Sequence, residues 1–304
     1  MLRFLLLLIS SHLIADITDH LKKITDKTGY HQIKNVDFIY MINLDQRPEK
    51  YAICMDRLAP YGIVPYRFSA VNGWELTLEA INDLGVKYEP WMSTGMGTRY
   101  LMNGNSEPFH GPLTEFGETY FSHCMSRGAI GICLSHLSIL QDAWDSGYET
   151  IWVMEDDIAP IQNPHLISTR IKELDTLLGK DGWDILFTDQ DTKNNNGQYV
   201  PCTGFAWQPN FSPANTSRFT QRYDVGTEFR KVGARFGAYS MIVRRSGMEK
   251  ILKFFKSFNI FLPYDIEFAL PNGIRFYALI NDIVSTQPGS LSDNGSPDYK
   301  NKEK

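Results

Sequence analysis

The sequence lacks several features that mark common classes of protein. Its 304 residues include four cysteines, and no two of them form a CxxC pair: Cys54, Cys124, Cys133 and Cys202. This pattern argues against a zinc knuckle, a thioredoxin-type site and a disulfide framework, and Cys54 and Cys133 lie on apolar helical faces, as buried thiols do. There is also no Walker-type loop, no GxGxxG and no GxSxG. A P-loop enzyme, a dinucleotide-binding Rossmann protein and a serine hydrolase with a nucleophile elbow are therefore disfavoured.

The chain has no excess of positive charge. Its 30 Lys and Arg face 35 Asp and Glu, which gives a net charge of −5 and a pI near 5.8. Because nucleic-acid binding depends on cations that displace the counterions of phosphate, we expect no nucleic-acid partner.

The sequence also lacks an apolar run long enough to cross a membrane. Residues 4–14 are mostly apolar, but a spanning helix needs roughly 20 such residues. The run is typical of a signal peptide or of a short amphipathic anchor. We therefore interpret residues 1–35 as a signal-like or anchoring segment, compatible with a cytoplasmic, membrane-associated or secretory location. The sequons at Asn210, Asn215 and Asn294 would matter only in the last case.

From residue 36 onward, apolar runs of strand length alternate with segments of helical periodicity. We predict strands at 38–42, 64–68, 151–154, 183–188, 239–243 and 276–280, and helices at 48–59, 128–146, 164–178 and 246–258. This alternation predicts an α/β fold with a mostly parallel sheet, whose ligand lies at the carboxyl ends of the strands. Two polar stretches, 92–122 and 189–236, are predicted to be mobile loops that order over the ligand.

Three acidic residues, Glu155, Asp156 and Asp157, directly follow the predicted strand at 151–154. Carboxylates crowded at the end of a buried strand repel one another unless a cation neutralises them, and Mg²⁺ and Mn²⁺ prefer such oxygen ligands. A metal held there could bridge the diphosphate of a nucleotide and stabilise it as a leaving group. On its own, however, such a triplet is more often an acidic turn in solvent.

Two further polar clusters are expected at the carboxyl ends of the strands, beside the acidic triplet. Residues 43–47, NLDQR, end the first predicted strand, where backbone amides of the next helix and the guanidinium of Arg47 could bind phosphates. The alternative is a simple helix cap. Residues 127–136, RGAIGICLSH, begin a predicted helix in which Gly128 and Gly131 would permit close approach to a ligand or another backbone. We interpret Ser135 and His136 as packing residues of that helix.

Taken in order, the segments INLDQRPEK, RFSAVNG, RGAIGICLSH, WVMEDDI, WDILF and GAYSMIVRRSGMEKIL resemble the motifs of glycosyltransferase family 25. This is the lipooligosaccharide and procollagen galactosyltransferase group, and the resemblance covers residues 36–293. It implies a glycosyltransferase domain over that range, followed by a flexible tail at 294–304. The fold that it implies is of GT-A type, with a mostly parallel Rossmann-like sheet flanked by helices.

The resemblance also implies an activity, with Mn²⁺ or Mg²⁺ as the cofactor. That activity is the inverting transfer of a sugar, with galactose favoured, from a UDP-sugar to a glycan, a lipooligosaccharide or a glycoprotein. By position, the resemblance assigns nucleotide binding to Asn43, Leu44, Arg47, Ala70, Gly73, Gly128 and Asp156, and metal binding to Glu155 and Asp157. Asn72 and Lys50 depart from the pattern, which more often has an acidic residue and an arginine there.

An inverting transfer needs a general base to deprotonate the acceptor hydroxyl. Asp265 in LPYDIEF resembles the P-x-D step of the family, although it could equally cap a helix, and Asp189, Asp191 and Asp282 are alternatives. No histidine follows His165, so a further metal ligand would have to be Asp282 or Asp293. Two other functions remain open: a family member without turnover that acts as a glycan-binding, adhesion or scaffold module, and a glycoside hydrolase with two opposed carboxylates.

Overall fold

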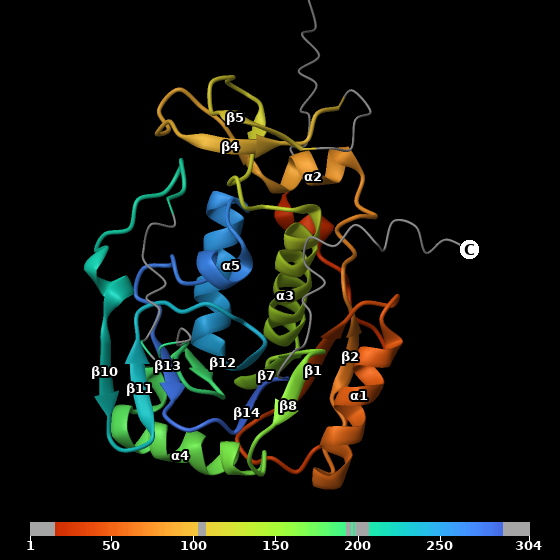
Figure 1. Ribbon diagram of the computed structural model, residues 1–304, viewed down its shortest axis with the longest axis vertical. Helices are drawn as coiled ribbons and strands as arrows, with labels where there is room; N and C mark the ends of the chain where they lie inside the picture. Colours follow the sequence, from red (N-terminus) through yellow and green to blue (C-terminus); the bar gives the residue numbers. More distant parts are fainter. Residues whose placement is uncertain (1–15, 103–107, 193–195, 197, 199–206, 288–304) are drawn as a thin grey trace, which may run out of the picture.

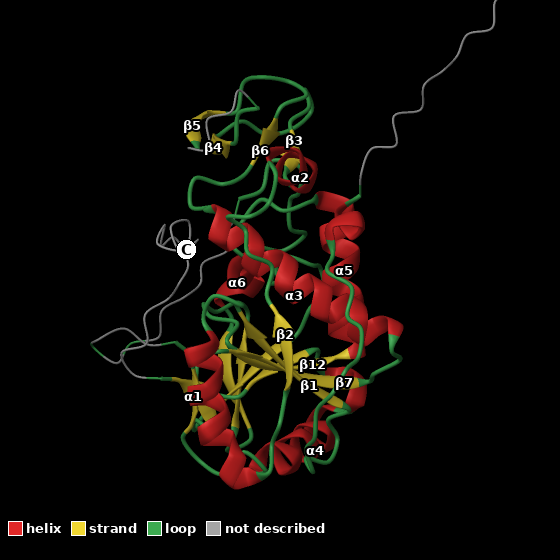
Figure 2. Cartoon of the chain, turned by 90° about the vertical axis from the view of Figure 1, so that its right-hand side faces the viewer, coloured by secondary structure: helices red, strands yellow, loops and turns green. Residues whose placement is uncertain are grey.

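The computed structural model describes residues 16–102, 108–192, 196, 198 and 207–287. These residues form one large sheet with helices on both of its faces, and a lobe of short strands lies beyond the helices of one face (Figures 1 and 2). The predicted α/β class is confirmed.

The large sheet has eight strands in the order β10-β11-β13-β9-β12-β7-β1-β2. Their bounds are β1 (Phe38–Asn43), β2 (Tyr66–Ser69), β7 (Thr150–Glu155), β9 (Ile185–Phe187), β10 (Arg222–Val225), β11 (Phe229–Val232), β12 (Ser240–Arg244) and β13 (Phe276–Leu279). β1 pairs in parallel with β2 and β7, and β13 with β9. The four other pairings are antiparallel.

The sheet is thus mixed, and the prediction of a mostly parallel, Rossmann-like sheet was wrong. The reason lies in the path of the chain after β9. It leaves β9 at its carboxyl end, and after the β10–β11 hairpin it enters β12 at that same end of β9, where the amide of Thr188 donates to the carbonyl oxygen of Ser240 at 3.4 Å. β12 therefore runs in the opposite direction and brings its first residues beside the last residues of β7, where Ser240 pairs with Met154.

Side chains alternate between two buried clusters on the two faces of the sheet. On β7, Ile151 and Val153 face one cluster, while Trp152 and Met154 face the other. The first cluster includes residues of α3 (Arg127–Asp145), α5 (Arg245–Phe258) and α6 (Tyr264–Glu267), and the second includes residues of α1 (Pro48–Leu58) and α4 (Leu166–Leu178). Cys133 and Cys54 are buried in these clusters, as predicted.

The lobe consists of α2 (Leu78–Leu84) and four short strands: β3 (Val86–Lys87), β4 (Met96–Arg99), β5 (Phe109–Pro112) and β6 (Thr119–Tyr120). Figure 2 places it at the end of the molecule away from the large sheet. The stretch 92–122 therefore contains β4, β5 and β6, and the stretch 189–236 contains β10 and β11. Residues 103–107 and most of 193–206 lie outside the described residues, and the mobility of both stretches stays a prediction.

Two smaller features complete the description. β8 (Ile158–Pro160) and β14 (Val284–Thr286) form a two-stranded antiparallel sheet. The segment before β1 packs on the domain: it includes the 3₁₀ helix η1 (Ile17–His20), and Ile17 and Ile33 are buried. The apolar residues 4–14, Asn294 and the tail at 294–304 lie outside the described residues. Among those described, no helix has the length and apolar character that spanning a membrane requires.

Candidate functional site

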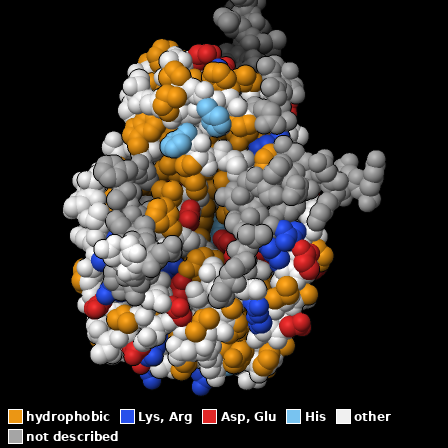
Figure 3. Space-filling view, in the orientation of Figure 1, with side chains coloured by type: hydrophobic (Ala, Val, Ile, Leu, Met, Phe, Trp, Pro, Cys, Tyr) orange, Lys and Arg blue, Asp and Glu red, His pale blue; other side chains and the backbone are white. Residues whose placement is uncertain are grey.

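A pocket lies where β1, β2 and β7 end and α3 begins. Its empty volume, which includes the open solvent at its mouth, is about 720 Å³. The pocket is lined by Ile42, Asn43, Leu44, Lys50, Ala70, Val71, Asn72, Gly73, Trp74, Gly128, Ile132, Ser135, His136, Glu155, Asp156 and Asp157. The face seen in Figure 3 is hollowed near its centre, and acidic side chains lie along the hollow.

Parallel pairing brings the predicted clusters into this one pocket. Ile42 of β1 is in register with Glu155 of β7, and Asn43 is in register with Ser69 of β2. Of the residues predicted to bind nucleotide or metal, all but Arg47 line the pocket: Asn43, Leu44, Ala70, Gly73, Gly128, Glu155, Asp156 and Asp157. Arg47 instead forms an ion pair with Glu49, with 2.5 Å between Nε and Oε1.

Asn43 is buried, and its side chain connects three segments. Its amide nitrogen donates to Oδ2 of Asp156 at 2.6 Å and to the carbonyl oxygen of Arg47 at 2.8 Å. Its amide oxygen accepts from Nε of Arg67 at 2.8 Å. With these contacts made, Asn43 orients Asp156 and the start of the turn before α1.

In the acidic triplet, one carboxylate oxygen of Asp157 is left without a hydrogen bond among the described residues. This atom, Oδ1, is buried. Burial, followed by the charges of Glu155 and Asp156, raises the pKa of Asp157 to about 7, whereas Lys50 opposes the shift. A buried carboxylate oxygen of this kind suits a cation.

The described residues contain no group of three His, Cys, Asp or Glu side chains placed to hold a metal by themselves. Mg²⁺ commonly binds through one or two carboxylates and completes its coordination with water and substrate phosphates. The acidic triplet could supply such carboxylates to a metal shared with a diphosphate, and the assignment of Glu155 and Asp157 as the ligands stays a prediction.

Two glycines allow helix α3 to approach the turn after β2. A Cβ atom on Gly73 would lie 1.7 Å from the carbonyl oxygen of Arg127, and one on Gly131 would lie 2.4 Å from that of Val71. The prediction of close approach at Gly131 is confirmed, with another backbone as its partner. Ser135 Oγ accepts from the amide of Val71 at 2.8 Å, so Ser135 helps to hold the turn, as a packing residue would.

Asp265 lies on α6, beside the pocket but outside its lining. Its Oδ2 atom accepts a hydrogen bond of 3.0 Å from the amide of Gly237. Burial raises the pKa of Asp265, and the nearby charge of Glu155 adds to the shift, while the Gly237 amide and His136 act against it. The preceding residue, Tyr264, stacks on the ring of His136 with 4.2 Å between centroids. Asp265 is therefore close enough to the acidic triplet to interact with it electrostatically.

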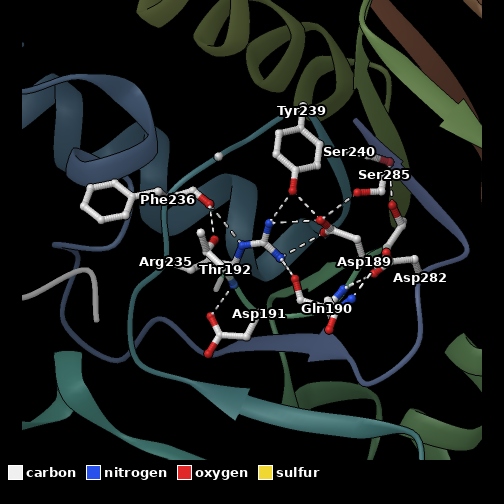
Figure 4. A network of polar contacts seen from close by, with 12 residues as sticks. Asp189, Gln190, Asp191, Thr192, Arg235, Phe236, Tyr239, Ser240, Asp282 and Ser285 are labelled. Carbon is white, nitrogen blue, oxygen red and sulfur yellow. Dashed lines mark hydrogen bonds and ion pairs between the residues drawn. The ribbon is translucent and has the colours of Figure 1, made fainter. Parts of the chain in front are cut away.

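The other candidate bases are engaged elsewhere. Asp189 is buried and forms an ion pair with Arg235, with 2.9 Å between Oδ1 and Nη1 (Figure 4). Asp191 pairs with Arg222 at 2.7 Å. Asp282 accepts from the amide of Gln190 at 2.8 Å. None of the three lines the pocket, and Asp293 lies outside the described residues.

Comparison with known proteins identifies the family. The family model described as "Glycosyltransferase family 25 (LPS biosynthesis protein)" matches residues 36–267. The chain belongs to glycosyltransferase family 25. The resemblance noted in the sequence is thereby confirmed over most of its extent.

Several family 25 proteins are similar over parts of this chain. A "Glycosyltransferase 25 family member" of Aedes aegypti is 27% identical over 59% of this chain and 25% of its own length. "Procollagen galactosyltransferase 1" of Danio rerio is 30% identical over 45% of this chain and 18% of its own. "Inactive glycosyltransferase 25 family member 3" of Homo sapiens is 26% identical over 69% of this chain and 30% of its own. The chain thus matches less than a third of each relative.

A solved structure, "Crystal Structure of A197 from STIV", covers 50% of this chain and 64% of its own at 15% identity, with a TM-score of 0.29. Such a loose superposition adds nothing to the assignment of this family 25 chain.

His136 and Lys50 are pocket residues of this family 25 chain that the sequence did not assign to the site. His136 is 1% exposed, and its Nε2 donates to Oε1 of Glu155 at 3.0 Å. It is a packing residue, as predicted, but one that also orients a predicted metal ligand. The spacing from Gly128 to His136 on one helix could have indicated that both face the pocket. Lys50 is one turn beyond Arg47 and faces the pocket in its place.

Proposed function

We propose that this chain is a metal-dependent, inverting glycosyltransferase that moves a sugar from a UDP-sugar to a glycan, a lipooligosaccharide or a glycoprotein, with galactose as the favoured sugar. The observation that carries the proposal is the pocket, in which an acidic triplet, a helix start and a glycine-containing turn meet at the carboxyl ends of three strands. Family membership supports the reaction class, and a relative named a procollagen galactosyltransferase supports the sugar.

In this proposal the diphosphate of the donor lies between the acidic triplet and the start of α3. Glu155 and Asp157 would hold the divalent cation, which would supply positive charge that stabilises the leaving diphosphate. Gly128 lies in the first turn of α3, a helix of 19 residues, where free backbone amides and the helix dipole favour an anion. The ammonium group of Lys50, from α1, adds a further positive charge at the pocket.

Asp265 is the proposed general base. As the acceptor oxygen forms a bond to the anomeric carbon, the bond from that carbon to the diphosphate oxygen breaks, and the hydroxyl proton passes to the Asp265 carboxylate. The raised pKa of Asp265 favours this role because a base whose pKa lies nearer to neutral pH accepts a proton more readily. Asp189, the other proposed catalytic residue, is less suited, since its carboxylate is already paired with Arg235.

The alternative is a family member that binds glycans without turnover, and relatives named inactive keep it open. The acidic triplet, with a buried oxygen on Asp157 that suits a cation, favours the enzyme.

Calorimetry with UDP-galactose in Mn²⁺ and in EDTA, together with an assay of UDP release, tests the proposal. We expect binding that is at least tenfold tighter in Mn²⁺, and Mn²⁺-dependent release of UDP. Equal binding in EDTA would refute the metal-dependent donor site, and tight binding without any release would favour the inactive alternative. A screen of other UDP-sugars under the same conditions would identify the donor.

A further inference from the structure

The segment at residues 235–239, between β11 and β12, contacts both carboxylates on which the proposed reaction depends. The amide of Gly237 donates to Oδ2 of Asp265 at 3.0 Å. The carbonyl oxygen of Tyr239 accepts from the amide of Glu155 at 2.8 Å. One short stretch of backbone thus touches the proposed base and a proposed metal ligand.

Two side chains of the same segment, those of Arg235 and Tyr239, belong to a polar network around Asp189 (Figure 4). Arg235 is 0% exposed, and its guanidinium donates to both carboxylate oxygens of Asp189, at 2.9 and 3.3 Å. It also donates to the carbonyl oxygens of Gln190 and Phe236 and to the hydroxyl of Tyr239. The Tyr239 hydroxyl in turn donates to Asp189. Both ends of the segment are therefore fixed to one carboxylate.

We propose that Asp189, Arg235 and Tyr239 form a clamp that positions the segment 235–239, and through its backbone Asp265 and Glu155, for catalysis. The inference rests on the proposed function, and it makes Asp189 a positioning residue rather than the base. A buried charge with every donor satisfied is a rigid anchor, because breaking any one contact leaves a polar group unpaired.

The conformation of Gly237 shows how closely the segment is constrained. Its φ angle is +87°, in the left-handed region, and a Cβ atom there would lie 2.5 Å from the ring of Tyr239. Any other residue would be strained at this φ and would have to displace the Tyr239 ring or the backbone around Gly237. Gly237→Ala is therefore expected to disturb the clamp at the amide that reaches Asp265 while leaving both carboxylates in the sequence.

The first experiment asks whether Gly237 acts through Asp265. We expect Gly237→Ala to lower kcat at least tenfold while the Kd for UDP in Mn²⁺ stays within twofold. Added to Asp265→Asn, the same change should lower kcat less than twofold further, since residues that act as a unit are not additive. Gly273→Ala is the matched control: its φ is +74°, nothing lies within 4 Å of a Cβ there, and we expect wild-type kcat. An unchanged kcat for Gly237→Ala, or an equal loss in both backgrounds, would overturn the proposal.

A second measurement does not depend on activity. Tyr239→Phe removes one hydroxyl from the clamp, and Tyr223→Phe removes one from an exposed position on β10. We expect hydrogen exchange at the amides of Gly237 and Glu155 to become at least fivefold faster in Tyr239→Phe and to remain unchanged in Tyr223→Phe. Unchanged exchange in Tyr239→Phe would overturn the clamp. If the wild-type chain turned over no UDP-sugar, the proposed function would fail, and exchange would still decide whether the clamp holds the segment.

Discussion

The side-chain amide of Asn43 donates a hydrogen bond of 2.6 Å to Oδ2 of Asp156 and so joins the ends of two neighbouring strands that lie 113 residues apart in the sequence. The contact fixes the central carboxylate of the acidic triplet and turns it toward β1. Because Asn43 also bonds to Arg47 and Arg67, we expect it to affect nucleotide binding through the shape of the pocket.

Asn43→Asp should therefore destabilise the protein in a pH-dependent way. The new carboxylate cannot donate to Asp156 or to the Arg47 carbonyl, and it places a like charge against Asp156. We expect the free energy of unfolding at pH 8 to fall by about 2–4 kcal/mol, with part of the loss recovered at pH 5, where the pair can share a proton. Urea denaturation at the two pH values measures this, and an equal loss at both would show that charge repulsion is not the cause.

The sequence predicted this part of the site well because the signals are local. An apolar run that ends in polar residues marks the carboxyl end of a buried strand, and parallel neighbours place such ends together. For this reason the pattern predicts that Asn43, residues 127–136 and the acidic triplet lie at one edge of the sheet, whereas Gly73 is assigned to the site only by the family resemblance. The glycine at 131 could be interpreted in the same way, because only a missing Cβ lets two backbones come so close.

Other features depend on contacts that no local pattern encodes. The direction of β12 is set by the path of the chain after β9, and the apolar run at 239–243 would look the same in either direction. The role of His136 depends on Glu155 lying 3.0 Å from its ring nitrogen, across two elements. The pairing of Asp189 with Arg235 joins segments 46 residues apart, so the sequence could not show that Asp189 is already paired and left it as an alternative to Asp265.

Asp157→Asn should stabilise the metal-free protein at pH 8. The pKa of Asp157 is raised to about 7 in the folded protein. From about pH 4 to about pH 7, the folded state therefore keeps a proton that the unfolded state has already released. Wild-type stability should consequently fall as the pH rises from about 4 to about 7 and then level off. The asparagine variant should lack this slope and gain roughly 1–3 kcal/mol at pH 8, because the raised pKa of the folded state disfavours the ionised carboxylate there. Thermal unfolding across pH 4–9 in EDTA is the measurement.

Addition of Mn²⁺ with UDP should make the wild-type protein more stable than Asp157→Asn, which reverses their order of stability in EDTA. The wild-type chain should gain stability because the cation binds only the folded state, and Asp157→Asn should gain less because it has lost an anionic ligand. The metal-dependent turnover of Asp157→Asn should fall together with its affinity for the metal. Equal thermal shifts in both proteins would show that Asp157 does not bind the metal.

His136→Phe separates the packing role of this ring from its contact with Glu155. The phenyl ring can still stack on Tyr264, but it cannot donate to the Glu155 carboxylate. We expect a Tm within a few degrees of wild type and Mn²⁺ affinity lower by about 10–100-fold, the usual effect of losing a residue that orients a metal ligand. Calorimetric titration of Mn²⁺ in the presence of UDP checks this. If His136→Phe bound Mn²⁺ as tightly as the wild type, the hydrogen bond from His136 to Glu155 would not contribute to metal binding.

Asp265→Asn should remove the base and leave the donor site intact. The asparagine oxygen can still accept from the Gly237 amide, so the Kd for UDP-sugar should stay within about twofold while kcat falls by roughly 10²–10⁴. In the wild-type protein, kcat should decline as the pH falls through the raised pKa of Asp265, because the protonated carboxyl can no longer accept a proton. The variant should lose this acidic limb.

Asp189→Asn provides the contrast, because it leaves the buried Arg235 without its counter-charge. We expect this variant to lose about 3–5 kcal/mol of stability and, where it remains folded, to keep the acidic limb of the pH–rate profile. If Asp189→Asn instead abolished the limb at unchanged Tm while Asp265→Asn transferred sugar normally, the base would be Asp189. Profiles of kcat against pH for the three proteins, each measured well below its Tm, therefore distinguish the carboxylate that takes the proton from the one that positions the backbone.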